Sequence, residues 1–261
     1  MNLETLLLDE QEGVATITLN RPDALNAWNE QMRQELFSTF EYVATNEAIR
    51  VVIYTGAGRA FGVGADVKST FTQKPTMPAH RYGNRLLTDF MTKMERVEKP
   101  FLAAINGVCV GGGLELAMGC DLRFCSDKAR LGFTENNIGL IPGATGTVRL
   151  ARMIGVDKAK ELIFNAELVD AEEALRLGLV TRVVPHDDLM AYTQEHARKL
   201  ARKAPQALGL AKLVILQAGN TDAQSAHAYE TMAQSILRRT RDHEEGVAAF
   251  REKRQPNFTG E

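Results

Sequence analysis

The chain of 261 residues is 44% hydrophobic and 25% charged, a composition that excludes disordered and fibrous proteins and predicts one or two globular units with a full core. Its 31 basic and 33 acidic side chains give a net charge of −2, with no long block of one sign. Neither nucleic acid nor an anionic membrane is therefore expected as a partner, and the basic residues near the C-terminus are interpreted as a solvated helix face.

No targeting or membrane segment is recognisable. No stretch approaches about 18 uninterrupted apolar residues, and the first residues, MNLETLLLDEQEG, contain acids but no basic region. We therefore expect a cytoplasmic protein. The odd set of Cys109, Cys120 and Cys125 predicts free, mostly buried thiols in a reducing compartment. The sequence has no CxxC, HExxH or HxH motif, so no metal site is expected.

The first half of the chain alternates strands and helices. Buried strands are predicted at Val14–Leu19, Val51–Thr55 and Phe101–Ile105, and helices over 29–44 and about 83–98. Residues 69–82 contain two prolines and little periodicity, so a loop is predicted there.

The second half is mainly helical. Short strands are predicted at Leu122–Cys125 and Val180–Val184, and helices over 145–153, 157–165, 171–177 and 187–202. Strands that are hydrophobic throughout favour a largely parallel sheet covered on both faces. From 206 to 253 only helices are expected, so we place a boundary between an α/β core, 1–205, and a helical tail, 206–261. So small a tail should pack on its own core or on a neighbouring subunit.

Several nucleotide and nucleophile motifs are missing. The GAGRAF segment after the second strand fails the GxGxxG pattern, because Phe61 takes the place of the third glycine. There is no GxxxxGK[ST] and no GxSxG. Dinucleotide binding and α/β-hydrolase chemistry are therefore disfavoured.

Two glycine turns are candidates for binding an anion. Gly111 to Gly113 precede the helix-forming run LELAM, and a second turn ends in Gly64, Ala65 and Asp66. A glycine turn at the start of a helix leaves backbone N–H groups free and directed outward. Two such turns at one edge of a parallel sheet can bring their N–H groups together. Two converging donors form an oxyanion hole, worth about 3–4 kcal/mol per donor in acyl chemistry.

Two carboxylates lie in apolar, glycine-bordered segments. Glu115 stands within GGGLELAMG and Glu135 within LGFTENNIGLIPG. A carboxylate buried without partners is unfavourable or becomes neutral. The plainer alternatives are that Glu115 caps its own helix and that Glu135 is a surface loop acid. If both stand near one oxyanion hole, different environments would separate their pKa values and divide acid and base roles between them.

Several motifs in order resemble the enoyl-CoA hydratase/isomerase family, the crotonase superfamily. They run from ATITLNRPDALNAWN through TGAGRAFGVGADVK and KPFLAAINGVCVGGGLELAMGCDLRFCSD to ARLGFTENNIGLIPGATGTVRL and AFREKRQPNF. The resemblance covers nearly the whole chain. It implies an α/β fold built as a spiral of ββα units, as in ClpP and crotonase, with a C-terminal helical region. It also implies trimers, paired into hexamers, with the tail at the trimer contact.

The resemblance also assigns positions in the site. Ala65 and Gly112 match the two oxyanion-hole N–H donors. The backbone along the path of the CoA thioester corresponds to Ala65, Asp66, Val67 and Lys68. Further matches are Glu115 and Glu135 to the two catalytic glutamates of hydratases, Gly143 to a backbone element near the water site, and Lys253 to a lysine that approaches the CoA phosphates in some members.

These matches imply syn hydration of a trans-2-enoyl-CoA to a 3-hydroxyacyl-CoA, a step of fatty-acid β-oxidation. Glu135 is expected to supply the proton to the α-carbon and Glu115 to hold the water, although the roles could be shared or reversed. No metal or redox cofactor is needed, since CoA is part of the substrate. A double-bond isomerase or another CoA-thioester enzyme is the alternative, and isomerases usually keep one of the two acids. A non-catalytic scaffold has little reason to keep either.

The sequence departs from the family in the stretch after Gly143. Thr145 and Val148 alter a segment that usually contains glycine and glutamine. This departure is expected to bear on acyl specificity more than on the class of reaction. Tyr82, Leu86 and Phe90 are candidates for the wall of the acyl pocket, with a role in the core as the alternative.

Overall fold

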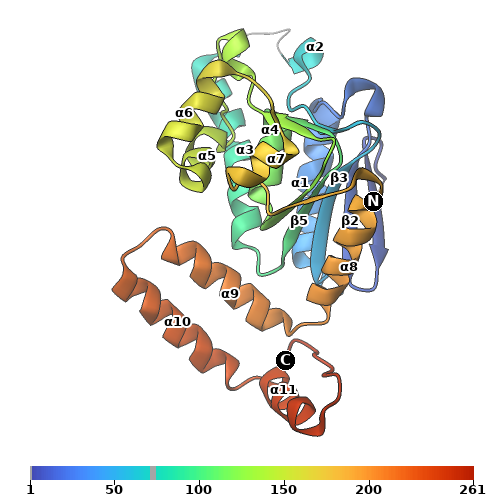
Figure 1. Ribbon diagram of the computed structural model, residues 1–261, viewed down its shortest axis with the longest axis vertical. Helices are drawn as coiled ribbons and strands as arrows, with labels where there is room; N and C mark the ends of the chain where they lie inside the picture. Colours follow the sequence, from blue (N-terminus) through green and yellow to red (C-terminus); the bar gives the residue numbers. More distant parts are fainter. Residues whose placement is uncertain (1, 71–74) are drawn as a thin grey trace.

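A computed structural model describes residues 2–70 and 75–261, and its centre is a six-stranded sheet (Figure 1). The strand order is β1-β2-β3-β5-β7-β10, formed by Leu6–Gln11, Val14–Leu19, Val51–Gly56, Phe101–Ile105, Leu122–Ser126 and Arg182–Val184. All neighbours are parallel except β1, which runs antiparallel to β2. The prediction of a largely parallel sheet is confirmed.

A second, smaller sheet lies beside the first. It has the order β4-β6-β8-β9, formed by Ala60–Gly62, Val108–Val110, Arg130–Gly132 and Val169–Asp170. Each of the pairs β3/β4, β5/β6 and β7/β8 gives one strand to each sheet before the chain enters a helix. The chain therefore advances as a spiral of ββα units, as the resemblance implied.

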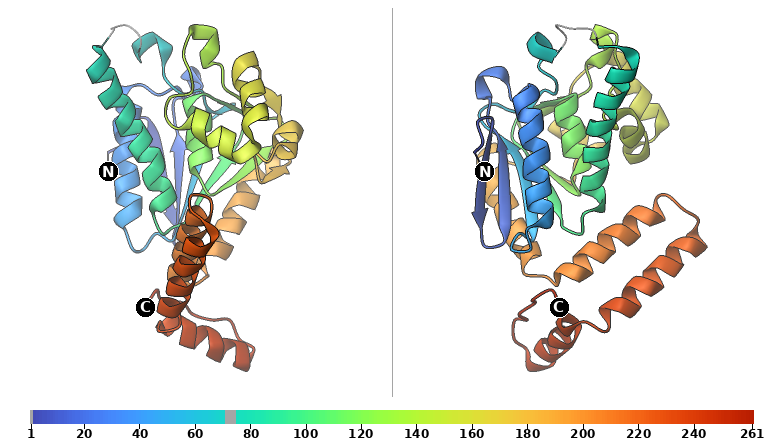
Figure 2. Two further views of the ribbon diagram at one scale, coloured as in Figure 1. Left: turned by 90° about the vertical axis from the view of Figure 1, so that its left-hand side faces the viewer. Right: turned by 180° about the vertical axis from the view of Figure 1, so that it is seen from behind.

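Helices cover both faces of the large sheet (Figure 2). On one face, α8 (Leu189–Ala201) packs against strand residues that include Val51 and Leu102. The opposite face is covered by α1 (Glu30–Thr45), α3 (Met77–Arg96) and α4 (Gly112–Gly119). Because both faces are buried, the central strands are apolar along their whole length, which is why they were readable from the sequence.

Three further helices follow the sequence prediction within a few residues: α5 (Gly146–Ile154), α6 (Val156–Asn165) and α7 (Ala171–Arg176). The short helix α2 (Val67–Thr70) and the 3-10 turns η1 (Pro22–Ala24), η2 (Glu135–Ile138) and η3 (His186–Asp188) complete these elements. No helix among residues 2–70 and 75–261 is long and apolar enough to cross a bilayer. All three cysteines are free and buried, as predicted.

The predicted loop over 69–82 is partly wrong. Residues 71–74 lie outside the described residues, but α3 already begins at Met77. The Thr76 side chain caps it by accepting the Ala79 N–H, and Pro78 fits the first turn, where its missing N–H is not needed. The prolines that suggested a loop therefore belong to a helix start.

The tail projects from one end of the core (Figure 1). It consists of α9 (Pro205–Ala218), α10 (Ala223–Leu237) and α11 (Arg241–Glu252). Large apolar side chains on all three helices face solvent in the single chain, with Ile215 72%, Met232 62% and Phe250 86% exposed. Exposed apolar surface of this kind is typical of interaction sites.

One buried lysine fastens the tail to the core. Lys212 of α9 places its Nζ 2.9 Å from Asp121 Oδ2 and donates to the carbonyl oxygens of Met94 and Lys99 at 2.7 and 2.9 Å. The side chain of Lys212 is 11% exposed. An ammonium that is buried and fully bonded in this way fixes the position of α9 relative to the end of α4.

Candidate functional site

The two glycine turns singled out in the sequence lie against one another. A Cβ atom added at Gly64 would stand 2.5 Å from the Gly112 nitrogen, and one added at Gly112 would stand 3.0 Å from the Gly64 Cα. Gly113 is equally close to the carbonyl oxygen of Gly62, 2.1 Å from an added Cβ. Side chains at these positions would force the two backbones apart.

Trp28 determines the direction of the Ala65 amide. Its N–H donates to Gly64 O at 2.7 Å, and its carbonyl accepts the Asp66 N–H at 3.0 Å. Since alternate backbone groups of an extended strand point to opposite sides, the Ala65 N–H points away from Trp28. Gly112 is the first residue of α4, where an N–H has no partner within the helix. Within the described part of the chain, neither amide donates to a protein acceptor.

Glu115 lies one turn into α4 and is 4% exposed. Its Oε1 accepts the N–H groups of Ala144 and Gly146 at 2.7 and 2.8 Å. The alternative in which Glu115 caps its own helix is therefore wrong, because its hydrogen bonds go to the segment before α5. The pKa of Glu115 is raised to about 7, with burial as the largest cause and the negative charge of Glu135 as a smaller one. The two N–H groups and the Arg149 guanidinium oppose the rise.

Glu135 is the first residue of the η2 turn and lies against the glycine triplet. A Cβ atom added at Gly111, which has a φ of +55°, would lie 2.8 Å from Glu135 Oε1. The Oε2 atom is buried and has no hydrogen-bond partner among the described residues. Burial raises the pKa of the Glu135 carboxyl as well. An unpaired buried carboxylate oxygen is unfavourable unless it serves a ligand or a proton, so Glu135 is not an ordinary surface acid.

The chain thus brings four candidate residues together. Ala65 and Gly112 present free amides on contacting loops, Glu135 lies against Gly111, and Glu115 lies in the first turn of α4. Carboxyl groups with raised pKa values beside outward-facing amides can exchange protons with a bound molecule whose developing negative charge the amides stabilise. This combination is suited to acyl-thioester chemistry that passes through an enolate.

The other candidate residues occupy different surroundings. Asp66 pairs with Arg21 at 3.0 Å and accepts the Lys68 N–H, which fixes the start of α2, while Val67 and Lys68 are exposed. The Gly143 carbonyl accepts a hydrogen bond from Asn84 at 2.8 Å. Lys253 follows the last turn of α11, at the opposite end of the molecule from α4 (Figure 1). Within one chain it does not approach the glycine turns.

The three candidates for the acyl-pocket wall on α3 differ in burial. Phe90 is 4% exposed and packs against Phe37 and Phe40 in tilted and edge-to-face geometry, with ring centroids 5.2 and 5.4 Å apart, so it belongs to the core. Tyr82 and Leu86 are exposed on the same helix, at 66% and 41%. Only these two are available to a ligand in the single chain.

Some supporting residues were not identified from the sequence. Asn26 donates to the carbonyl oxygens of Ala57 and Ala60, which holds the turn that leads to Ala65. Trp28 is the only tryptophan in the chain, and this was the one feature of the sequence that could have drawn attention to it. Arg149 is 8% exposed in the apolar face of α5, and a cation at such a position could have indicated a buried network.

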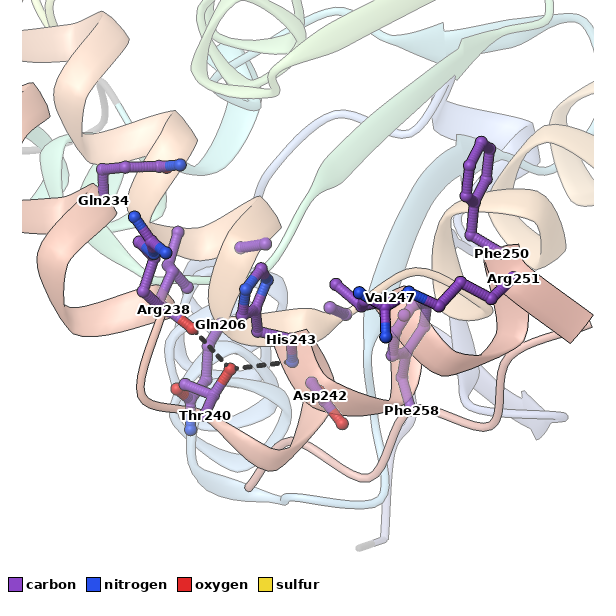
Figure 3. Close-up of a pocket in the computed structure, with 14 residues that line it drawn as sticks. Gln206, Gln234, Arg238, Thr240, Asp242, His243, Val247, Phe250, Arg251 and Phe258 are labelled. Carbon is purple, nitrogen blue, oxygen red and sulfur yellow. Dashed lines mark hydrogen bonds between the residues drawn. The ribbon is translucent and has the colours of Figure 1, made fainter.

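A groove in the tail lies away from these residues (Figure 3). It has a volume of about 530 Å³ and is lined by residues of α9, α10 and α11 together with Phe258. Phe250 and Phe258 give it apolar walls, and Thr240 caps α11 by accepting the His243 N–H. None of the four residues gathered at the glycine turns lines this groove. No group of three His, Cys, Asp or Glu side chains in the described ranges is arranged to hold a metal ion.

Comparisons with known proteins agree on one family. A model of the enoyl-CoA hydratase/isomerase family matches residues 9–261. A short-chain-enoyl-CoA hydratase of Clostridium acetobutylicum is 39% identical over 98% of this chain and 97% of that protein. A probable enoyl-CoA hydratase of Mycobacterium bovis is 38% identical over 99% of each chain. The crystal structure of an enoyl-CoA hydratase from Bacillus anthracis matches with a TM-score of 0.94 at 37% identity, covering 99% of this chain and 100% of that one.

Proposed function

The chain belongs to the enoyl-CoA hydratase/isomerase family and has its crotonase fold, and on that premise we propose that it is an enoyl-CoA hydratase. This hydro-lyase adds water, with syn geometry, to a trans-2-enoyl-CoA and gives a 3-hydroxyacyl-CoA, as in fatty-acid β-oxidation. The observation that carries the proposal is the pair of carboxyl groups with raised pKa values, Glu115 and Glu135, next to the glycine triplet that presents the Gly112 amide.

The proposed role of the two amides is electrostatic. The thioester oxygen lies between the N–H groups of Ala65 and Gly112, and it gains negative charge as water attacks the β-carbon. Support comes from the contact between Gly64 and Gly112, which fixes the two loops relative to one another before substrate arrives. Donors that are already oriented need no reorganisation during the reaction, which is why such sites are effective.

The proposed division of labour follows the hydrogen bonds of the two carboxyl groups. Glu115 holds the water and takes its proton, because two backbone N–H groups on one oxygen favour its ionised form and leave the other oxygen available. Glu135 delivers a proton to the α-carbon, and its unpaired Oε2 atom is suited to that role. The negative charge of Glu135 raises the pKa of Glu115, so the proton affinity of Glu115 depends in part on the ionisation of Glu135.

The reaction as proposed is acid–base chemistry and needs no metal or redox cofactor. The acyl-CoA thioester is the only small-molecule partner. We propose that the chain acts as a homotrimer or homohexamer that associates through the tail, whose apolar side chains face solvent in the single chain. Lys253 is remote from Gly112 within one chain, so a role at the CoA phosphates requires the Lys253 of another subunit.

Crotonyl-CoA hydration tests the proposal directly. The ultraviolet absorbance of the 2-enoyl thioester should fall on addition of the protein, and the product should gain one molecule of water by mass spectrometry. Glu115→Gln and Glu135→Gln should each lower the rate by about 10² to 10⁴. Glu41→Gln, at a carboxylate that is 57% exposed on α1, is the matched control and should keep the wild-type rate.

Two outcomes would contradict the proposal. Near wild-type turnover in either catalytic-site variant removes that glutamate from the mechanism. Faster conversion of a 3-enoyl-CoA than of crotonyl-CoA identifies a double-bond isomerase instead. A panel of 2-enoyl-CoAs of different length and branching then defines the acyl specificity.

A further inference from the structure

Thr145 has a backbone conformation that its side chain disfavours. It lies between Ala144 and Gly146 with φ 82° and ψ −9°, in the left-handed region. Of the six non-glycine residues with positive φ in the described ranges, Thr145 alone is β-branched. A β-branched residue in this region is a clear outlier, and such strain persists only where the surrounding structure enforces it.

The strained residue sits between the two donors that bind Glu115. The N–H groups of Ala144 and Gly146 converge on Glu115 Oε1 at 2.7 and 2.8 Å. A left-handed residue between two such amides turns both N–H groups toward one point and creates a concave anion-binding site. Gly146 allows the close approach, since an added Cβ atom there would lie 2.6 Å from Glu115 Oε1.

A buried arginine holds Thr145 in place. Arg149 Nη1 donates to Thr145 Oγ1 at 2.7 Å, and Arg149 is itself 8% exposed. Its remaining donors are fixed by α3, where Nε bonds Glu95 Oε1 at 2.7 Å and Nη2 bonds the Met91 carbonyl at 2.8 Å. The hydroxyl of Thr145 is therefore tied to a guanidinium that the core has already oriented.

We propose that Thr145 is a positioning residue for Glu115, held by Arg149 and Glu95, so that this hydroxyl keeps two amides aimed at the carboxyl group. The inference rests on the proposed function for its effect on the rate. Thr145 lies in a stretch that usually contains glycine in the family. Glycine adopts the left-handed conformation freely, whereas threonine requires the bond to Arg149.

The consequence is a defined proton affinity for Glu115. The charged groups that influence it are Glu135 and Arg149. When the hydroxyl is removed and the branched shape is kept, the segment from 144 to 146 is free to leave the left-handed conformation. Glu115 then loses N–H donors that favour its ionised form, and its pKa rises.

The test compares three substitutions at one position. Thr145→Val removes the hydroxyl and keeps the branched shape. In the pH–rate profile, it should raise the apparent pKa of the limb that Glu115 controls by about one unit. The kcat at pH 7 should fall about fivefold, because less Glu115 is ionised. Thr145→Ser keeps the hydroxyl, and Thr145→Gly needs no support; both should stay close to the wild-type pH profile. Thr193→Val, at a buried threonine of α8 whose hydroxyl bonds Leu189 O, is the control for the same substitution away from the site.

A second measurement does not depend on turnover. The pKa of Glu115 is measured from the 13C chemical shift of its carboxyl carbon, followed against pH in the protein without substrate. This pKa should rise by the same amount in Thr145→Val and stay unchanged in Thr145→Ser. If Thr145→Val does not fold, Glu95→Gln decides, because it weakens the hold on Arg149 and should move the titration in the same direction. The inference is overturned if the Glu115 titration curve of Thr145→Val, or of Glu95→Gln where Thr145→Val does not fold, superimposes on that of the wild type. A wild type without hydratase activity overturns the proposed function alone, since the titration still decides the role of Thr145.

Discussion

Gly64→Ala is a direct test of the two-amide arrangement. The new Cβ atom would lie 2.5 Å from the Gly112 nitrogen, whereas ordinary contact begins at 3.4 Å. Its neighbours there are backbone atoms, which cannot rotate out of the way as a side chain could. The two loops must therefore separate by about 0.9 Å, and the Ala65 and Gly112 amides no longer point to one oxygen atom.

The expected effect on catalysis is large. A displacement of about 1 Å at a reacting group costs about 10²-fold, and loss of one oxyanion donor costs about 10² to 10³ in kcat. We expect kcat for crotonyl-CoA to fall by about 10² to 10³, with a smaller change in KM. The reason is that the amides bind the charge of the transition state more strongly than the neutral thioester.

Gly58→Ala separates this effect from backbone strain. Gly58 has a φ of +72°, close to the +76° of Gly64, but an added Cβ atom meets only the Pro22 side chain, at 3.1 Å. Both variants should lose about 1–2 kcal/mol of stability from alanine in the left-handed region, and only Gly64→Ala should lose turnover. Rates are measured by the ultraviolet assay at 25 °C, after circular dichroism has shown that both variants are folded. A Gly64→Ala enzyme within threefold of wild type would refute the role of the paired amides.

Two further predictions concern stability and assembly. Burial raises the pKa of Glu115 from 4.5 to about 7, so the carboxyl contributes stability below pH 4.5 that is lost as the pH rises through 7. Relative to Glu115→Gln, the free energy of unfolding of the wild type should fall by about 3 kcal/mol over that interval in urea titrations, and parallel pH profiles would contradict the shift. Light scattering should give a mass of three or six times the 28.8 kDa of one chain. Phe250→Asp, at a side chain that is 86% exposed, should shift the population toward monomers. A monomeric wild type would contradict assembly through the tail.

The parts of the fold that the sequence predicted are those whose burial is uniform. The central strands β3 and β5 are buried along nearly their whole length and read as continuous apolar runs. Strand β1 was not predicted, because it is an edge strand with mostly exposed side chains. Its start is held instead by the Glu35 carboxylate, which accepts the Thr5 and Leu6 N–H groups. Strands of two or three residues, such as β4 and β9, are too short for a period to be read.

The site was predictable where glycine turns or buried acids mark it and unpredictable where ordinary backbone amides supply the contacts. The glycine triplet and the two acids drew attention because carboxylates in apolar segments need a reason. The donors that bind Glu115 are main-chain amides of Ala144 and Gly146, some 30 residues away. Any residue except proline has such an amide, so no pattern in the sequence distinguishes these two. The strain at Thr145 is a property of φ and was equally invisible.

The ion pair between Lys212 and Asp121 links the tail to the helix that carries the Gly112 amide. Helix α4 starts at Gly112 and ends at Gly119, two residues before the Asp121 that Lys212 grips. One end of this helix, about 12 Å long, carries the Gly112 amide, and the other lies beside the carboxylate that Lys212 of α9 binds. In an assembly formed through the tail, contacts between subunits therefore also restrain α4 and the Gly112 amide at its start.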